Sequence, residues 1–163
     1  MNGLALKALV AFVALPGMVA FAVPLLLIAP PTALNVPVAL VTLAPGVLIL
    51  LRCVRDFYVS GRGTLAPWAP PRQLVITGLY RYTRNPMYVG VLLILAAWAA
   101  CFRSLPLAVY AFAVAVAFHI RVVVGEEPTL ARSFGEEWDR YRQQVPRWIG
   151  VTSLFRLRSF LIR

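Results

Sequence analysis

Residues 8–51 read ALVAFVALPGMVAFAVPLLLIAPPTALNVPVALVTLAPGVLILL, a run of 44 residues between Lys7 and Arg52 without a charge or a histidine. A helix needs about 20 apolar residues to cross the hydrocarbon core of a bilayer. The run therefore predicts two membrane spans. The helix breakers concentrated in residues 30–37 (PPTALNVP) predict the turn between them.

The rest of the chain continues this pattern. Of its 163 residues, 61% are hydrophobic and only 13% are charged, and a soluble domain of this size cannot bury so much apolar surface. We expect an all-α integral membrane protein of about four transmembrane helices, followed by a cytosolic amphipathic helix. The expected spans are residues 4–29, with kinks at Pro16 and Pro24, and residues 38–58, 86–102 and 105–124.

Basic residues predict the orientation in the membrane. The net charge of +10 resembles that of a nucleic-acid-binding protein, but the arginines flank apolar spans, where anionic headgroups are the better partner. The loop 59–85 with the adjoining helix end holds six arginines, and the segment from Arg121 onward holds eight. Lysine and arginine bias places short loops in the cytosol. We therefore expect a multi-pass protein with both termini cytosolic and no cleaved signal peptide, because the first apolar run is too long.

The two cysteines are not expected to pair. Cys53 falls at the predicted cytosolic end of the second span, and Cys101 falls at the outer end of the third. A membrane thickness between them excludes a disulfide.

A polar segment, residues 77–88 (TGLYRYTRNPMY), precedes the third span. Asn85 is a favourable N-cap residue and Pro86 suits the first helical position, so we expect a helix start whose free N–H groups attract an anion. A plain interfacial anchor of tyrosine and arginine explains the same composition.

A second polar segment, residues 125–130 (GEEPTL), follows the fourth span. Gly125 is expected to end that span and Pro128 to open the next helix. Glu126 and Glu127 either cap this helix or hold a cationic or hydroxyl-bearing ligand. An apolar stripe at helical spacing then predicts one tail helix packed on the bundle or the bilayer, through Leu130, Phe134, Trp138, Tyr141 and Val145. The single histidine, His119, has either a structural or a functional role.

Together these segments resemble the isoprenylcysteine carboxyl methyltransferase family, which is related to the phospholipid N-methyltransferases. The resemblance rests on GLYRYTRNPMYVG at residues 78–90, EEPTLARSFGEEWDRY at 126–141 and VPR at 145–147. It covers about residues 70–150, which we expect to form the methyltransferase core of a single membrane domain. Residues 1–58 form an N-terminal hairpin in this division, and residues 151–163 form a basic interfacial tail.

The resemblance implies S-adenosylmethionine as the methyl donor, bound at the cytosolic helix ends. Carried over by position, the cofactor-binding residues are Leu74, Val75, Tyr80, Asn85, Pro86, Met87, Tyr88, Glu126 and Glu127. Arg121 and Glu126 are the expected catalytic residues, and no metal is implied. Two positions depart from the family pattern. Asn85 replaces a frequent histidine, and Arg121 matches the family's substrate arginine only with an offset of one residue.

The function implied is methyl transfer to a lipid-borne acceptor at the cytosolic face, with a prenylcysteine-type carboxylate favoured. A phospholipid amine or a thiol stays open as acceptor. An NADPH-dependent membrane reductase and a non-catalytic membrane protein are the alternatives of another class. The expected partners are a lipid or prenylated substrate and membrane lipids, without nucleic acid, and the oligomeric state is not specified.

Overall fold

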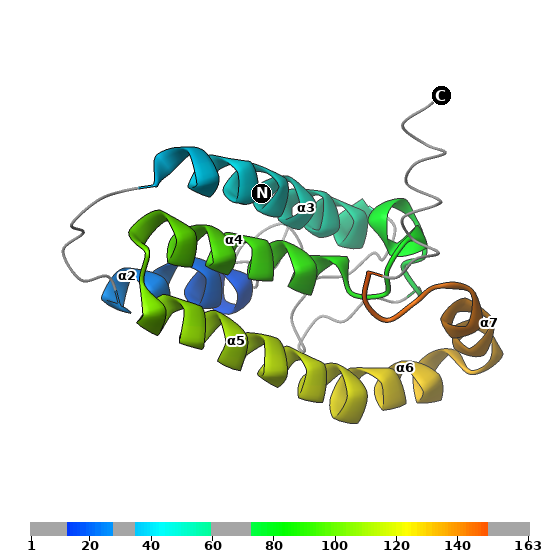
Figure 1. The fold of residues 1–163 in the computed structure, drawn as a ribbon. Helices are drawn as coiled ribbons and strands as arrows, with labels where there is room; N and C mark the ends of the chain where they lie inside the picture. The colour runs from blue at the N-terminus through cyan, green and yellow to red at the C-terminus, as the bar shows by residue number, and fades with distance from the viewer. Residues whose placement is uncertain (1–12, 28–34, 60–72, 150–163) are drawn as a thin grey trace.

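The computed structural model describes residues 13–27, 35–59 and 73–149, and the regular elements in these ranges are all helices (Figure 1). This confirms the all-α class. In chain order the elements are η1 (Val13–Ala22), α2 (Val23–Leu27), α3 (Val36–Val59), η2 (Gly78–Arg81), α4 (Pro86–Phe102), α5 (Leu105–Ile120), η3 (Arg121–Glu126), α6 (Glu127–Phe134) and α7 (Glu136–Gln144).

Helix α4 is the centre of the bundle. It lies between α3 and α5 in Figure 1 and also contacts η1. The crossing of α3 and α4 depends on two glycines, because a Cβ on Gly46 would lie 2.9 Å from the carbonyl oxygen of Gly90. A Cβ on Gly90 would lie 3.0 Å from the carbonyl oxygen of Gly46. The two backbones are therefore in direct contact, which fixes the start of α4 against α3.

Within the described ranges, two helical stretches are long and apolar enough to cross a bilayer, Val36–Asp56 and Leu105–Phe134. The helices Pro16–Leu27 and Pro86–Phe102 are shorter. The predicted count of four spans is therefore not reached by helix length. For the first predicted span the comparison is partial, since residues 4–12 and 28–29 lie outside the described ranges, as do most of the predicted turn and the tail 151–163.

Several predicted boundaries are confirmed. Helix α4 has the expected limits, and α3 exceeds the expected second span by two residues at its start and one at its end. The tight connection between α4 and α5 is also as expected: Arg103 adopts a left-handed conformation, and the hydroxyl of Ser104 accepts a hydrogen bond from the N–H of Leu107. This short connection makes α4 and α5 antiparallel neighbours.

Pro24 changes the backbone hydrogen bonding of the first helix, where π winding gives way to α winding at Val23. Proline has no N–H, so the carbonyls four and five residues earlier, on Ala20 and Val19, lose their usual donor. Side chains replace it: Trp98 donates to the Ala20 carbonyl at 2.9 Å, and Tyr110 donates to the Val19 carbonyl at 3.1 Å. Polar backbone groups in apolar surroundings need such partners.

The predicted end of the fourth span at Gly125 is wrong. Helix α5 continues through the π-helical η3 into α6, so that one helical stretch runs over Leu105–Phe134. Pro128 does stand in the first turn of α6, as expected. The hydroxyl of Thr129 donates to the Gly125 carbonyl at 2.8 Å across the joint between η3 and α6.

The single tail helix is also wrong, because the chain breaks at Gly135, with φ +49°, into α6 and α7. The predicted apolar stripe nevertheless forms one cluster, in which Leu130 and Phe134 of α6 pack on Trp138, Tyr141 and Val145.

The cysteines lie at opposite ends of the bundle, as predicted. The carbonyl of Cys101 accepts a hydrogen bond from the N–H of Asn35, at the start of α3. Cys53 lies 18 residues further along α3, or roughly 27 Å at the rise of an α-helix. Both cysteines are free.

Candidate functional site

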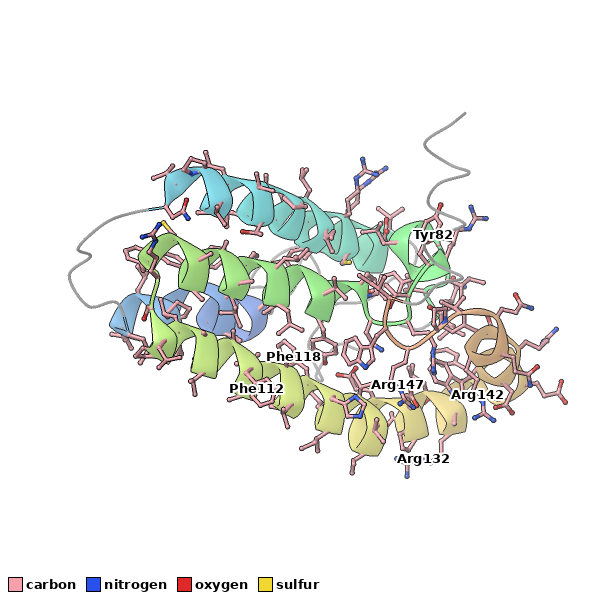
Figure 2. The ribbon with its side chains drawn as sticks, in the orientation of Figure 1. Tyr82, Phe112, Phe118, Arg132, Arg142 and Arg147 are labelled. Carbon is pink, nitrogen blue, oxygen red and sulfur yellow. The ribbon has the colours of Figure 1, made fainter. Side chains whose placement is uncertain are left out.

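The start of α4 meets η3 and the segment 145–148 at one end of the bundle (Figures 1 and 2). Pro86 occupies the first turn of α4, as predicted, and Asn85 is the N-cap residue by position. The side chain of Asn85 does not cap the helix, which corrects the prediction. Its amide instead donates to the carbonyl of Arg147 at 3.0 Å.

Tyr88, Arg121 and Glu126 form what we call the open cluster. The Tyr88 hydroxyl donates to Oε1 of Glu126. Nε of Arg121 donates to the same carboxylate oxygen at 2.9 Å and to the Tyr88 hydroxyl at 3.2 Å. The side chains of Arg121 and Glu126 are 54% and 34% exposed, so the cluster can reach a ligand from outside the bundle.

The π winding of η3 makes the Arg121–Glu126 ion pair possible. The two residues are five apart, and in an α-helix side chains with this spacing point about 140° away from one another. A π-helix bonds residue i to i+5, as the N–H of Glu127 does to the carbonyl of Val122, so side chains five apart lie one turn above the other. The π winding therefore brings together two side chains that are one residue too far apart to meet on an α-helix.

Arg84, Glu127 and Arg147 form a second cluster, which we call the clamp. Arg147 binds the Glu127 carboxylate with both Nε at 2.7 Å and Nη2 at 2.8 Å, and Arg84 adds Nη1 at 2.9 Å. The Arg84 guanidinium also lies over the ring of Trp138 at 5.3 Å. Burial lowers the pKa of Arg84, and the Glu127 carboxylate opposes that effect.

Backbone contacts attach the segment 145–148 to the polar segment before α4. The carbonyl of Arg147 accepts hydrogen bonds from the hydroxyl of Thr83 and the amide of Asn85, both at 3.0 Å, and the N–H of Arg84 donates to the carbonyl of Pro146 at 2.9 Å. Figure 2 shows Arg147 over α6, with Arg132 pointing away from it. Residues more than 60 positions apart are thereby held side by side.

The model of the phospholipid methyltransferase family matches residues 54–137, just over half of the chain. The chain belongs to this family. The matched region contains Tyr88, Arg121 and Glu126, whereas Arg147 lies beyond it. Neither the curated proteins nor the solved structures contain a significant match to the chain. Membership implies a membrane methyltransferase with S-adenosylmethionine as methyl donor, and the family includes isoprenylcysteine methyltransferases.

The other predicted residues of this family member lie around the two clusters. Val75 and Tyr80 pack with Cys53 in a buried cluster, and Met87 packs against its edge. Leu74 packs on the Trp138 cluster. Burial raises the pKa of the Tyr80 phenol, and the Tyr80 carbonyl accepts a hydrogen bond from Tyr141 at 2.8 Å. These contacts are with Cys53 and with the Trp138 cluster, and the contribution of these residues to cofactor binding stays a prediction.

Sequence reasoning missed the clamp. Arg84 and Arg147 both belong to the motifs of the resemblance, but the sequence assigns neither of them a partner. The signal available was the acidic pair itself: two adjacent glutamates in a strongly basic region require nearby cations, and both arginines lie inside the quoted motifs.

Proposed function

We propose that the chain transfers a methyl group from S-adenosylmethionine to a lipid-borne acceptor at the cytosolic face of the membrane, with a prenylcysteine-type carboxylate as the preferred acceptor. The proposal includes a four-span topology with both termini cytosolic. In this topology the two shorter helices also cross the bilayer, and α6 and α7 lie on its cytosolic surface.

The open cluster is the observation that carries this proposal. It joins a tyrosine from α4 to an arginine and a glutamate from η3, and the tyrosine and the glutamate are 38 positions apart in the chain. The first turn of α4 adds the backbone N–H groups of Met87 and Tyr88, which have no carbonyl partner inside the helix. A site that offers a carboxylate, a cation and a helix start suits a zwitterionic nucleoside such as S-adenosylmethionine.

The side chains at this site have the chemical character that S-adenosylmethionine requires. Glu126 and Tyr88 would hold amino or hydroxyl groups, and Asn85, Pro86 and Met87 would border it at the start of α4. Leu74, Val75 and Tyr80 would support its apolar side, with Glu127 fixing its neighbour Glu126 in place. When bound, S-adenosylmethionine supplies an electrophilic methyl carbon on a sulfonium centre.

Electrostatics restrict the role of Glu126. The positive charge on sulfur disappears during methyl transfer, so a carboxylate directly against it would stabilise the ground state more than the transition state. Glu126 therefore serves binding and orientation, away from the sulfonium. The protein accelerates the reaction by aligning the acceptor with the methyl group, and Arg121 and Tyr88 keep the carboxylate in one position.

Arg121 favours a carboxylate acceptor. Its side chain is half exposed beside Tyr88 and Glu126, so a second carboxylate can pair with the guanidinium from outside. A carboxylate also needs no general base, whereas an amine or a thiol must lose a proton. A phospholipid amine is the second candidate, because the matched family is described by phospholipid methylation.

The test uses the purified full chain in lipid nanodiscs. Calorimetric titration should show binding of S-adenosylmethionine and none of NADPH. Methyl transfer from radiolabelled S-adenosylmethionine is then measured with N-acetyl-S-farnesylcysteine, dioleoylphosphatidylethanolamine and dodecanethiol. We expect labelling of the farnesylcysteine above all. Labelling of the amine alone would replace the preferred acceptor by the second candidate, and binding of NADPH alone would indicate a reductase. Binding of neither S-adenosylmethionine nor NADPH would contradict the proposed enzymatic activity.

A further inference from the structure

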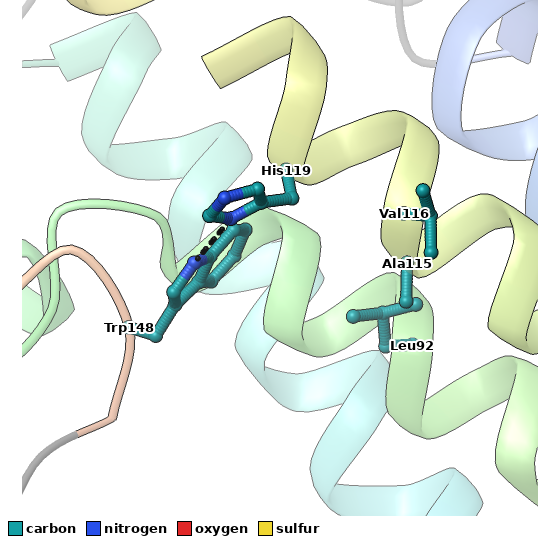
Figure 3. Close-up of a pocket in the computed structure, with 5 residues that line it drawn as sticks. All are labelled: Leu92, Ala115, Val116, His119 and Trp148. Atoms are coloured by element: carbon teal, nitrogen blue, oxygen red, sulfur yellow. Dashed lines mark hydrogen bonds between the residues drawn. The ribbon is translucent and has the colours of Figure 1, made fainter. Parts of the chain in front are cut away.

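A hollow of about 370 Å³ lies beside α4 and α5 (Figure 3). Leu92 of α4 and Ala115, Val116 and His119 of α5 line it, and Trp148 of the segment 145–148 closes one side. Its volume falls in the range of ligand pockets, roughly 300–1,000 Å³.

The hollow is one helical turn from the open cluster. Leu92 follows Tyr88 by four residues on α4, and His119 precedes Arg121 by two residues on the opposite helix. Between them, the ring of Phe118 packs on the ring of Tyr88 at a centroid distance of 4.3 Å. A molecule seated in the hollow would therefore have one end about 6 Å, one helical turn, from the Tyr88 level.

Trp148 is held in place at both ends. The neighbouring Arg147 is attached by its carbonyl to Thr83 and Asn85, and by its side chain to Glu127. The indole N–H of Trp148 donates to Nδ1 of His119 at 3.3 Å, and the two rings stack at 6.2 Å. This contact pairs the only polar atom of the Trp148 ring with Nδ1 of His119, so the indole offers aromatic carbon to the hollow.

The chemistry of the lining selects a hydrocarbon occupant. Leucine, alanine and valine line the hollow, and α5 also exposes Phe112 and Ile120 on its surface, as a helix facing lipid does. An apolar chain is stabilised in such a groove, whereas a polar group would lose its hydration without a partner.

We propose that this hollow seats the hydrocarbon chain of the methyl acceptor, with Trp148 and His119 as the boundary that determines which chains fit. The inference rests on the proposed function and names the part of the substrate that is recognised away from the reacting group. The headgroup would then lie at Tyr88, Arg121 and Glu126.

The test compares Val116→Phe with Val109→Phe. Both valines are exposed on α5, two turns apart, but only Val116 lines the hollow. With N-acetyl-S-farnesylcysteine, and in parallel with dioleoylphosphatidylethanolamine, Val116→Phe should raise KM about tenfold, the effect of leaving roughly two methylene groups unburied. Val109→Phe should leave KM within about twofold, a difference below half of that free energy. The affinity for S-adenosylmethionine, measured by calorimetry, should be unchanged in both.

Trp148→Ala is a second variant, because it enlarges the hollow instead of filling it. We expect it to raise KM for the farnesyl probe and to reduce the discrimination between farnesyl and geranyl chains, whereas Trp148→Phe should keep most of that discrimination. If neither Val116→Phe nor Trp148→Ala changes KM while the wild type methylates a probe, the hollow holds bulk lipid only and the inference is wrong. A wild type that neither binds S-adenosylmethionine nor methylates a probe would overturn the proposed function, and this inference with it.

Discussion

Glu126 and Glu127 are adjacent in the sequence and have the same chemistry, but they belong to different environments. Glu126 pairs with one arginine and one tyrosine, and its side chain is 34% exposed. Glu127 pairs with two arginines, and its side chain is 18% exposed. Adjacent residues on a helix point about 100° apart. One carboxylate therefore faces α4 and the other faces the segment 145–148.

The difference separates a ligand-binding role from a structural one. In the clamp, two cations share one carboxylate that lies inside the fold and joins α6 to segments near residues 84 and 147. In the open cluster, more than half of the Arg121 side chain is exposed, so its guanidinium can take a further partner. We infer that Glu127 stabilises the fold and that Glu126 acts on the ligand.

The largest effect on stability is expected for Glu127→Gln. The substitution leaves two arginines without their shared counter-charge, and the Arg84 side chain is only 11% exposed. We expect a loss of roughly 2–3 kcal/mol in the free energy of unfolding, between the values for exposed and for fully buried pairs. Thermal unfolding in detergent measures it.

Asp139→Asn is the matched control for that variant. Asp139 pairs with Arg142 at 2.8 Å, but both side chains are more than half exposed. Exposed pairs of this kind contribute about 0–1 kcal/mol. Equal melting temperatures for the two variants would remove the distinction between the clamp and an ordinary surface ion pair.

Arg121→Ala should affect activity more than stability. It removes a charged hydrogen-bond donor from the open cluster, and the loss of one such bond, about 1.5–3 kcal/mol, predicts a fall of about 10- to 100-fold in kcat/KM with a carboxylate acceptor. The melting temperature should stay close to that of the wild type. A variant with wild-type kcat/KM would remove Arg121 from the site.

Deletion of Gly125 should have a smaller effect than Glu127→Gln or Arg121→Ala. Removing one residue converts the π turn to α winding, and Arg121 then precedes the glutamate by four residues, a spacing at which side chains also meet. A Cβ at Gly125 would meet nothing within 4 Å, so packing does not require the glycine. We expect kcat/KM within about threefold of the wild type, less than 1 kcal/mol.

The control for the deletion is the insertion of one alanine after Gly125, which moves the two side chains apart around the helix. It should reduce kcat/KM as Arg121→Ala does. If the deletion were as harmful as the insertion, π winding would not be the reason that Arg121 and Glu126 meet.

Local patterns predicted much of the fold. The limits of α4 follow from Pro86 at its start and from the end of the apolar run at Phe102, and Arg103 and Ser104 give the connection to α5. The resemblance brought Tyr88 and Glu126 into one predicted site, and the structure places them in contact.

Two details of the structure, one local and one long-range, differ from the prediction. Gly125 followed by Pro128 is typical of a helix end, yet the helix continues through this joint with π winding. Asn85 has the residue type of an N-cap, but the carbonyl of Arg147, 62 positions away, takes its side-chain donor. The partner of Asn85 lies far outside the local pattern, whereas Thr129, which donates to the Gly125 carbonyl, lies within it, four residues after Gly125.

The central claim is that Glu126, and not its neighbour, contacts the methyl donor. Calorimetric titration of S-adenosylmethionine into the wild type, Glu126→Gln and Asp139→Asn tests it most directly. We predict that Glu126→Gln weakens binding by about tenfold or more, the effect of one charged hydrogen bond, at an almost unchanged melting temperature. Asp139→Asn should bind as the wild type does. Equal affinity in all three proteins would contradict the assignment of the open cluster as the donor site.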